Sequence, residues 1–294
     1  EVRAAAEAAV EDCLSVVCAQ GFSVVFPAVA EVLNGRSAWQ TSVGCLNCFT
    51  THVRGDGRAQ MVAQIDRLMA ACTEALTDTK PEVQEAARRA ITAIANELVT
   101  SPEMKAMVPS LLQAVFAPGE ETMPCVEKLM DVTFVNPIDG PCLSLMVPVL
   151  SRALKERRVE FRRRASLVVG NMCALVIDGT ALIPYATLLL PDLHNCVRDS
   201  NPEMRQYGAS ALTALLRGMA SAHLSQQFDR MVQDLDRLQR DMVSDKAEVR
   251  EAAERGLQQL MDVAAAQATK VGHTEEEVAA DLARLEMEDK QRAD

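Results

Sequence analysis

Six basic residues crowd one short stretch of this chain, where one expected helix ends and the next begins. Arginine side chains make planar, bidentate contacts to phosphate, so a ridge of them at a turn could touch RNA. The alternative is a solvated turn in which Glu156 and Glu160 are the partners of the basic side chains. The six residues, called the basic ridge below, are Lys155, Arg157, Arg158, Arg162, Arg163 and Arg164.

Cys45, Cys48 and His52 are spaced so that they would share one face of a helix, where they could begin a zinc site. A strong zinc signature pairs two short ligand motifs at a set distance, and the second motif is missing. We therefore interpret them as two core thiols and an imidazole near the end of a helix, and we assign no metal.

Gly55-Asp56-Gly57-Arg58 resembles part of a phosphate loop. It lacks the preceding strand, the lysine and the Ser/Thr that a Walker motif uses to hold phosphates and magnesium, so we interpret it as a turn between helices. The pattern G-x-x-x-x-G-K-[ST] does not occur in the sequence. We expect no ATP binding and no cofactor.

The histidines do not indicate a catalytic site. None lies in a nucleophile motif such as G-x-S-x-G, and we interpret them as scattered surface residues. Acidic residues near Lys or Arg are typical of a helix surface. The sequence therefore predicts a protein that is not an enzyme and has no small-molecule substrate. The four histidines are His52, His194, His223 and His273.

Composition limits the remaining classes. The chain has 294 residues, of which 49% are hydrophobic, with no apolar run near the ~18 residues of a membrane helix and no signal peptide. Nine cysteines without framework spacing favour reduced thiols and a cytoplasmic protein. A net charge of −11 argues against coating nucleic acid, so any phosphate contact must be local. The start at Glu1, inside an apparent helix, favours a piece of a longer protein.

A repeat organises the chain. An acidic or Pro residue precedes an apolar residue, then a basic or polar one, then small residues, at intervals of roughly 37 to 45 residues that are typical of two-helix HEAT units. About seven helix pairs fit the chain. The apolar residues at these helix starts are Val2, Trp39, Val83, Met123, Phe161, Met204 and Val249.

A second pattern precedes four of these starts by about 12 to 14 residues: an apolar residue, a proline and a Leu- or Val-rich segment. It predicts that each unit has a first helix with a proline early in it, a turn and a second helix. The prolines are Pro27, Pro109, Pro148 and Pro191.

The second helices carry one wide apolar face at helical spacing, and strand signals are missing. In the ridge helix we expect this buried stripe to include Phe161, Ala165, Val168 and Val169, so the exposed members among Arg162, Arg163 and Arg164 should be replaceable at little cost in stability. The predicted fold is all-α: a HEAT-repeat α-solenoid, an armadillo-like superhelix, over residues 1–270. Residues 271–294 are predicted to be a charged helical tail or linker.

One segment carries a family resemblance. Residues Thr133 to Val176 resemble the HEAT region shared by fungal-type translation elongation factor 3 and the large ribosome-associated activator of the general-control (amino-acid starvation) kinase. The resemblance spans Glu1 to Met219. Phe134-Val135 and Gly170-Asn171-Met172 are closer to the kinase activator, whereas Ser151-Arg152 is closer to the elongation factor, so both relatives stay open.

The resemblance implies a ribosome-bound HEAT scaffold in translation. In both families this surface contacts ribosomal RNA and ribosomal proteins, and the basic triplet of those relatives matches Arg162, Arg163 and Arg164. Any ATPase cassettes would lie outside this chain. The competing hypothesis is a HEAT adaptor that binds only protein partners on its solenoid faces, with no ribosome role.

Overall fold

The computed structural model describes residues 2–16, 19–34, 38–54, 57–222, 226–244 and 246–266, and all regular structure in these ranges is helical. They form two compact units, divided within helix α10 (Val159–Ala174). The first unit runs to Val168 and includes Leu175–Ile177, and the second takes Val169–Ala174 and resumes at Asp178. The predicted tail, residues 271–294, lies outside the described residues.

In the described residues of the first unit, nine helices precede α10. They are α1 (Val2–Val16), α2 (Ala19–Asn34), α3 (Trp39–Arg54), α4 (Arg58–Ala63), α5 (Ile65–Ala75), α6 (Pro81–Leu98), α7 (Pro102–Phe116), α8 (Pro118–Asp131) and α9 (Gly140–Leu154). The second unit contains the 3-10 helix η1 (Gly179–Leu182), α11 (Ile183–Val197), α12 (Pro202–Ala220), α13 (Gln226–Val232), α14 (Leu235–Asp241) and a helix over residues 247–266.

The repeat predicted from the sequence is confirmed. Six of the seven expected helix starts fall within the first three residues of a helix, and Met123 lies in the second turn of α8. Short turns join α7 to α8, α9 to α10 and α11 to α12, so each of these pairs is antiparallel. The all-α repeat fold is therefore established, and the curvature of the superhelix stays a prediction.

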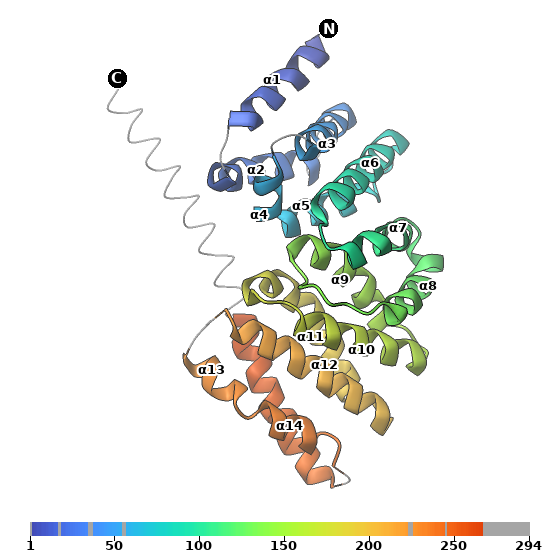
Figure 1. The fold of residues 1–294 in the computed structure, drawn as a ribbon, viewed down its shortest axis with the longest axis vertical. Coiled ribbons are helices and arrows are strands. Elements are labelled where there is room, and N and C mark those ends of the chain that lie inside the picture. The colour runs from blue at the N-terminus through green and yellow to red at the C-terminus, as the bar shows by residue number, and fades with distance from the viewer. Residues whose placement is uncertain are drawn as a thin grey trace, which may run out of the picture. The chain divides into compact units, whose positions relative to one another are not determined.

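Helices of different pairs stack on one another in the first unit. The second helices α1, α3 and α6 pack one on the next, and the first helices α2, α5 and α9 form the neighbouring layer (Figure 1). Helix α9 is buried almost throughout, with Leu143, Met146 and Leu150 at most 1% exposed. Fully burying such side chains contributes about 1.5–3 kcal/mol each, so the stacked helices carry the stability of the unit.

The predicted position of the prolines is wrong. Pro27, Pro109, Pro148 and Pro191 lie in the middle of α2, α7, α9 and α11, and not near their starts. Helix α7 begins about two turns before Pro109, where the Ser101 hydroxyl accepts a hydrogen bond from Met104 N. Helix α9 begins about two turns before Pro148, where the Asp139 carboxylate accepts a hydrogen bond from Cys142 N. A mid-helix proline removes one backbone hydrogen bond, and burial of the helix in the stack offsets that loss.

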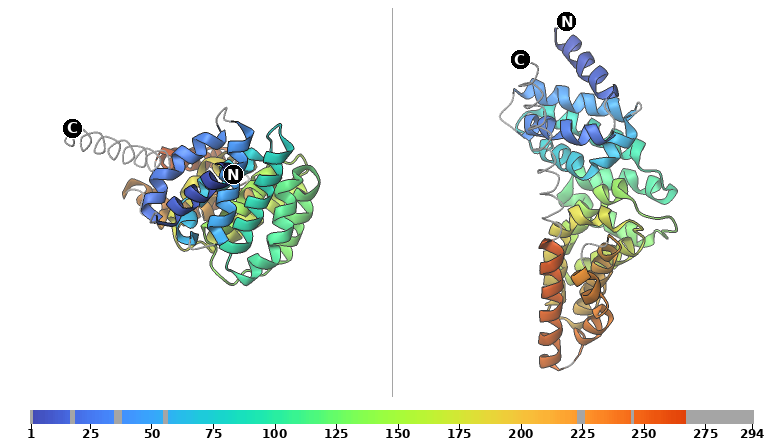
Figure 2. Two further views of the ribbon diagram at one scale, coloured as in Figure 1. Left: turned by 90° about the horizontal axis from the view of Figure 1, so that it is seen from above. Right: turned by 90° about the vertical axis from the view of Figure 1, so that its left-hand side faces the viewer.

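The second unit has its own close contact between helices. Helices η1 and α11 pack on α12, and a Cβ added to Gly208 of α12 would lie 2.9 Å from the backbone of Cys196 in α11. Helix 247–266 lies beside α14 (Figure 2), where Gly256 faces Leu238. Its Glu254 carboxylate also pairs with Arg198, the residue directly after α11, at 2.8 Å.

The buried stripe of α10 begins later than predicted. Ala165, Val168 and Val169 are buried as expected, but Phe161 is only half-buried, and the Arg158 guanidinium lies over one face of its ring, 4.7 Å from the centroid. The first turn of α10 is therefore part of the surface.

The histidine interpretation is wrong where the structure tests it. His52 is 5% exposed, stacks on Phe22 and shares a hydrogen bond with the Gln60 side chain. The side chain of His194 is 15% exposed and lies next to Glu254. His223 and His273 lie outside the described residues. Spacing alone could not reveal the neighbours that contact these two imidazoles in the folded chain.

Burial also fits the thiol interpretation. No cysteine of the described ranges is in a disulfide, and six of them are buried. Burial raises the pKa of the Cys72 and Cys173 thiols to about 12. In the described part of the chain, no helix is long and apolar enough to cross a membrane.

The loop between α8 and α9 is fastened by one carboxylate. Glu103, in the first turn of α7, accepts hydrogen bonds from the Asn136 side chain at 2.8 Å, the Ser101 hydroxyl at 2.8 Å and Val135 N at 3.3 Å. These bonds, the one from Asn136 above all, lower the pKa of Glu103 from 4.5 to about 2.

This clasp predicts acid sensitivity. Because the pKa is lower in the folded state, the stabilisation is fully present above the unfolded pKa of 4.5 and is lost as the pH falls from there towards about 2. We expect the stability advantage of the parent over Glu103→Gln, measured by urea unfolding, to shrink over that range. A stability difference between the parent and Glu103→Gln that stays constant from pH 6 to pH 2 would contradict this role of Glu103.

Candidate functional site

The basic ridge occupies the turn between α9 and α10. Lys155 closes α9, its backbone N–H donating to Arg152 O at 3.1 Å. Arg158 opens α10, its carbonyl accepting from Phe161 N at 3.1 Å and Arg162 N at 3.3 Å. The turn is thus held by backbone hydrogen bonds at both ends, and its side chains project from a defined frame.

Half of the ridge is exposed. Lys155, Arg157 and Arg158 are all exposed, with the Lys155 ammonium 3.2 Å from the Ser151 hydroxyl. The Arg158 guanidinium rests on Phe161, which limits its freedom without neutralising its charge. Arg157 makes no side-chain hydrogen bond or ion pair with any residue in the described ranges. These three cations face solvent.

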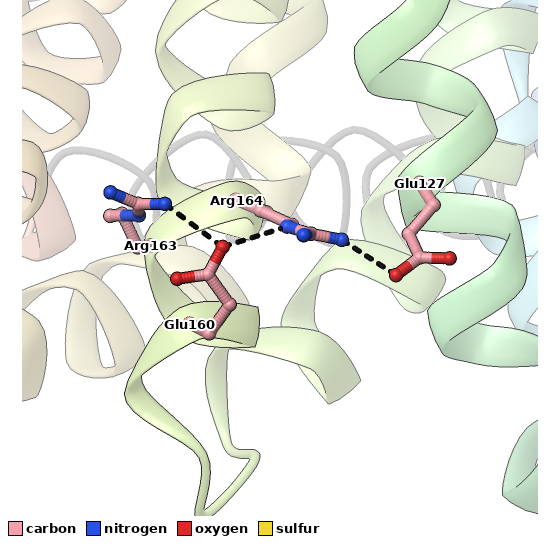
Figure 3. Close-up of polar contacts among 4 residues, drawn as sticks. All are labelled: Glu127, Glu160, Arg163 and Arg164. Atoms are coloured by element: carbon pink, nitrogen blue, oxygen red, sulfur yellow. Dashed lines mark hydrogen bonds and ion pairs between the residues drawn. The ribbon is translucent and has the colours of Figure 1, made fainter.

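Two of the three remaining residues of the ridge, Arg163 and Arg164, are tied to carboxylates (Figure 3). The Glu160 Oε1 accepts from Arg163 Nη2 at 2.9 Å and from Arg164 Nε at 3.1 Å. Arg164 Nη1 also donates to Glu127 of α8 at 2.6 Å. The hydrogen bond from Arg163, together with that from Arg164, holds the pKa of Glu160 below its ordinary value.

The six basic residues therefore form two groups and not one uniform ridge. Arg162, Arg163 and Arg164 are half-buried, whereas the other three are exposed. Glu160 is a partner of Arg163 and of Arg164, as the alternative of a turn paired with acidic residues predicts. One turn of α10 places Arg163 and Arg164 beside Glu160, and Arg164 also reaches Glu127 of α8.

Charge on the turn stays positive. Six cations meet three carboxylates, Glu127, Glu156 and Glu160, which leaves a surplus of three positive charges in a chain of net charge −11. The first turn of α8 carries Glu120 and Glu121 instead. An anion approaching the first unit is therefore attracted at the α9–α10 turn and repelled next to it.

The other candidate chemistry is accounted for by packing. Cys48 and His52 are buried in the core and Cys45 is half-buried, and within the described ranges no three His, Cys, Asp or Glu residues are grouped to hold a metal ion. Gly55 and Asp56 lie outside the described residues. Gly57 precedes α4, and Arg58 pairs with Glu97 at 2.7 Å.

Two family models match this chain. The elongation factor 3/GNC1 HEAT repeat matches residues 121–226, and the N-terminal HEAT repeat of elongation factor 3 matches residues 1–91. The chain contains the HEAT repeats of the elongation factor 3/GNC1 family. The resemblance of Thr133 to Val176 is therefore confirmed, and every residue of the α9–α10 site lies within the match of the elongation factor 3/GNC1 HEAT model.

Curated relatives from both branches of this HEAT family align with the chain. Protein ILITYHIA of Arabidopsis thaliana is 36% identical over 74% of the chain, and the human stalled ribosome sensor GCN1 is 32% identical over 75%. Elongation factor 3 of Candida albicans is 31% identical over 74%. The chain spans only 8%, 8% and 20% of these proteins, respectively.

The family repeat also explains the one site residue that sequence reasoning missed. Glu127 lies 37 residues before Arg164, which is close to the spacing of the HEAT unit. Equivalent positions on successive second helices face each other in a stack. An acidic residue about one repeat length before Arg164 in the sequence could therefore have been predicted as its partner.

Proposed function

We propose that this chain is a ribosome-binding HEAT scaffold of a cytoplasmic translation factor, and that its α9–α10 turn contacts ribosomal RNA. The observation that carries the proposal is the surplus of positive charge on an exposed turn of an otherwise acidic chain. Relatives in the same family are named stalled ribosome sensor and elongation factor 3, which supports a role in translation.

Phosphate contact would begin at Arg157 and Arg158. Both are exposed, and a guanidinium binds phosphate through a rigid fork of N–H donors. Lys155 adds a compact cation beside them. The stacking of Arg158 on Phe161 reduces the entropy that its side chain loses on binding. The α9–α10 frame therefore presents its cations before the RNA arrives.

The scaffold itself needs no catalytic site. The chain is a stack of helices, and we propose that any nucleotide chemistry of the full-length protein resides outside it. Protein partners, including ribosomal proteins, would contact other faces of the helix pairs, because repeat proteins build their binding surfaces from several consecutive turns.

Cosedimentation with purified ribosomes through a sucrose gradient tests the proposal. We expect the chain to migrate with ribosomes at low salt and to leave them progressively as salt rises, since phosphate contacts release counterions. Free chain at the top of the gradient at every salt concentration would overturn the ribosomal role and favour the adaptor. Ribosome binding that does not change with salt concentration would support the ribosomal role but contradict the proposed RNA contact.

A further inference from the structure

Two guanidinium groups converge on a single oxygen at the start of α10. Arg163 approaches Glu160 Oε1 from one side and Arg164 from the other, as Figure 3 shows. Glu127 holds the far edge of Arg164, so this guanidinium is fixed from two directions. The side chains of both arginines are about one-third exposed, at 33% and 32%, and can be reached from solvent.

Such convergence is what a phosphate oxygen requires. Arginine forks match carboxylate and phosphate alike, and charge-assisted hydrogen bonds to either have similar lengths. The Glu160 carboxylate is 45% exposed and belongs to the first turn of α10, so it can swing away without disturbing the buried stripe. The carboxylate thus occupies a position that an RNA phosphate could take.

We propose that Arg163 and Arg164 form a phosphate site that Glu160 keeps occupied, and that RNA already docked on the exposed cations of the turn displaces it. This inference rests on the proposed ribosomal function and adds a source of selectivity to it. An unstructured polyanion gains little at the occupied site, because it must compete with a tethered carboxylate. Repulsive elements of this kind are a common means of rejecting wrong partners.

Neutralising the competitor should therefore strengthen binding. Glu160→Gln keeps the size of the side chain but removes the negative charge that both arginines contact. If one further phosphate then binds, affinity for single-stranded RNA should rise about five-fold at 0.1 M salt, and the log–log salt slope should steepen by about 0.7. A purely structural role of Glu160 predicts no gain in affinity.

The experiment measures fluorescence anisotropy of labelled oligo(U) RNA against the parent chain, Glu160→Gln and the matched control Glu156→Gln. The control removes the same charge from an exposed residue of the same turn. We expect the gain for Glu160→Gln, less than a two-fold gain for Glu156→Gln, and loss of the gain when Arg163→Ala and Arg164→Ala are added. Equal gains in the two single variants, or none, would overturn the inference.

A ribosome arm separates this inference from the proposed function. In cosedimentation, Glu160→Gln should bind ribosomes at least as well as the parent, while its preference for ribosomes over oligo(U) falls. If the parent fails to bind ribosomes, the proposed function is wrong and the selectivity claim falls with it. If the parent binds ribosomes and oligo(U) binding is unchanged by Glu160→Gln, only the occupied phosphate site is wrong.

Discussion

Replacing Arg157 and Arg158 together by alanine is expected to weaken ribosome binding about 25- to 60-fold at 0.1 M salt. Both guanidiniums are exposed at the turn, and each phosphate contact contributes about 0.7 to 0.9 to the log–log salt slope, so the slope should fall by about 1.4 to 1.8. The loss of the stacking between Arg158 and Phe161 should cost only about 0.5–1 kcal/mol of folding stability.

The control for this variant is Lys80→Ala with Lys105→Ala, which removes two exposed positive charges elsewhere in the first unit. It should leave the salt slope within about 0.3 of the parent, because contacts and not total charge set the slope. Arg163→Ala with Arg164→Ala should have a smaller effect than the change at Arg157 and Arg158, since Glu160 and Glu127 already neutralise that pair. Equal losses from all three double variants would show a general charge effect and no specific site.

Gly208→Ala is expected to destabilise the second unit by about 1–3 kcal/mol, because the new methyl group would meet backbone atoms of Cys196 and Val197 at 2.9 Å. Backbone in the interior of two packed helices cannot move aside as a flexible side chain can. Urea unfolding followed by helical circular dichroism measures the change.

Gly119→Ala is the matched control for this change. A Cβ at Gly119, in the first turn of α8, would meet no atom within 4 Å. Alanine there should stabilise the chain by about 0.4–1 kcal/mol by restricting the unfolded state. If both substitutions shift the unfolding midpoint in the same direction, close packing of α11 on α12 is not what Gly208 provides.

The repeat was predictable because two patterns in the sequence indicate it, the recurring helix starts and the helical spacing of apolar residues. An apolar residue such as Met204 or Val249 lies near the start of a second helix, and apolar residues at helical spacing come directly after it. The starts of the first helices were not predictable from Pro109 or Pro148, because a proline is normally a helix breaker and the burial that tolerates it depends on neighbouring units.

The residues of the basic ridge were predictable from the sequence, but their separation into an exposed group and a half-buried group was not. Sequence spacing placed Glu160 within reach of Arg163 and Arg164, as residues three and four apart on a helix. It could not decide which arginines a partner from α8 would also hold. Contacts between neighbouring helix pairs recur at sequence separations near the repeat length. Arg58 and Glu97 are 39 residues apart, and Arg152 and Ala114 are 38 residues apart. This regularity locates such partners once the repeat is known.

Site-specific photocrosslinking tests the RNA contact most directly. Benzoylphenylalanine in place of Glu156, between Lys155 and Arg157, leaves every cation of the turn intact, and the same residue in place of Glu120 in the first turn of α8 is the control. After irradiation of the ribosome complex, we predict ribosomal RNA crosslinked from position 156 and little or none from position 120. A chain that cosediments with ribosomes but yields only protein crosslinks from position 156 would contradict the assignment of the α9–α10 turn as the RNA contact.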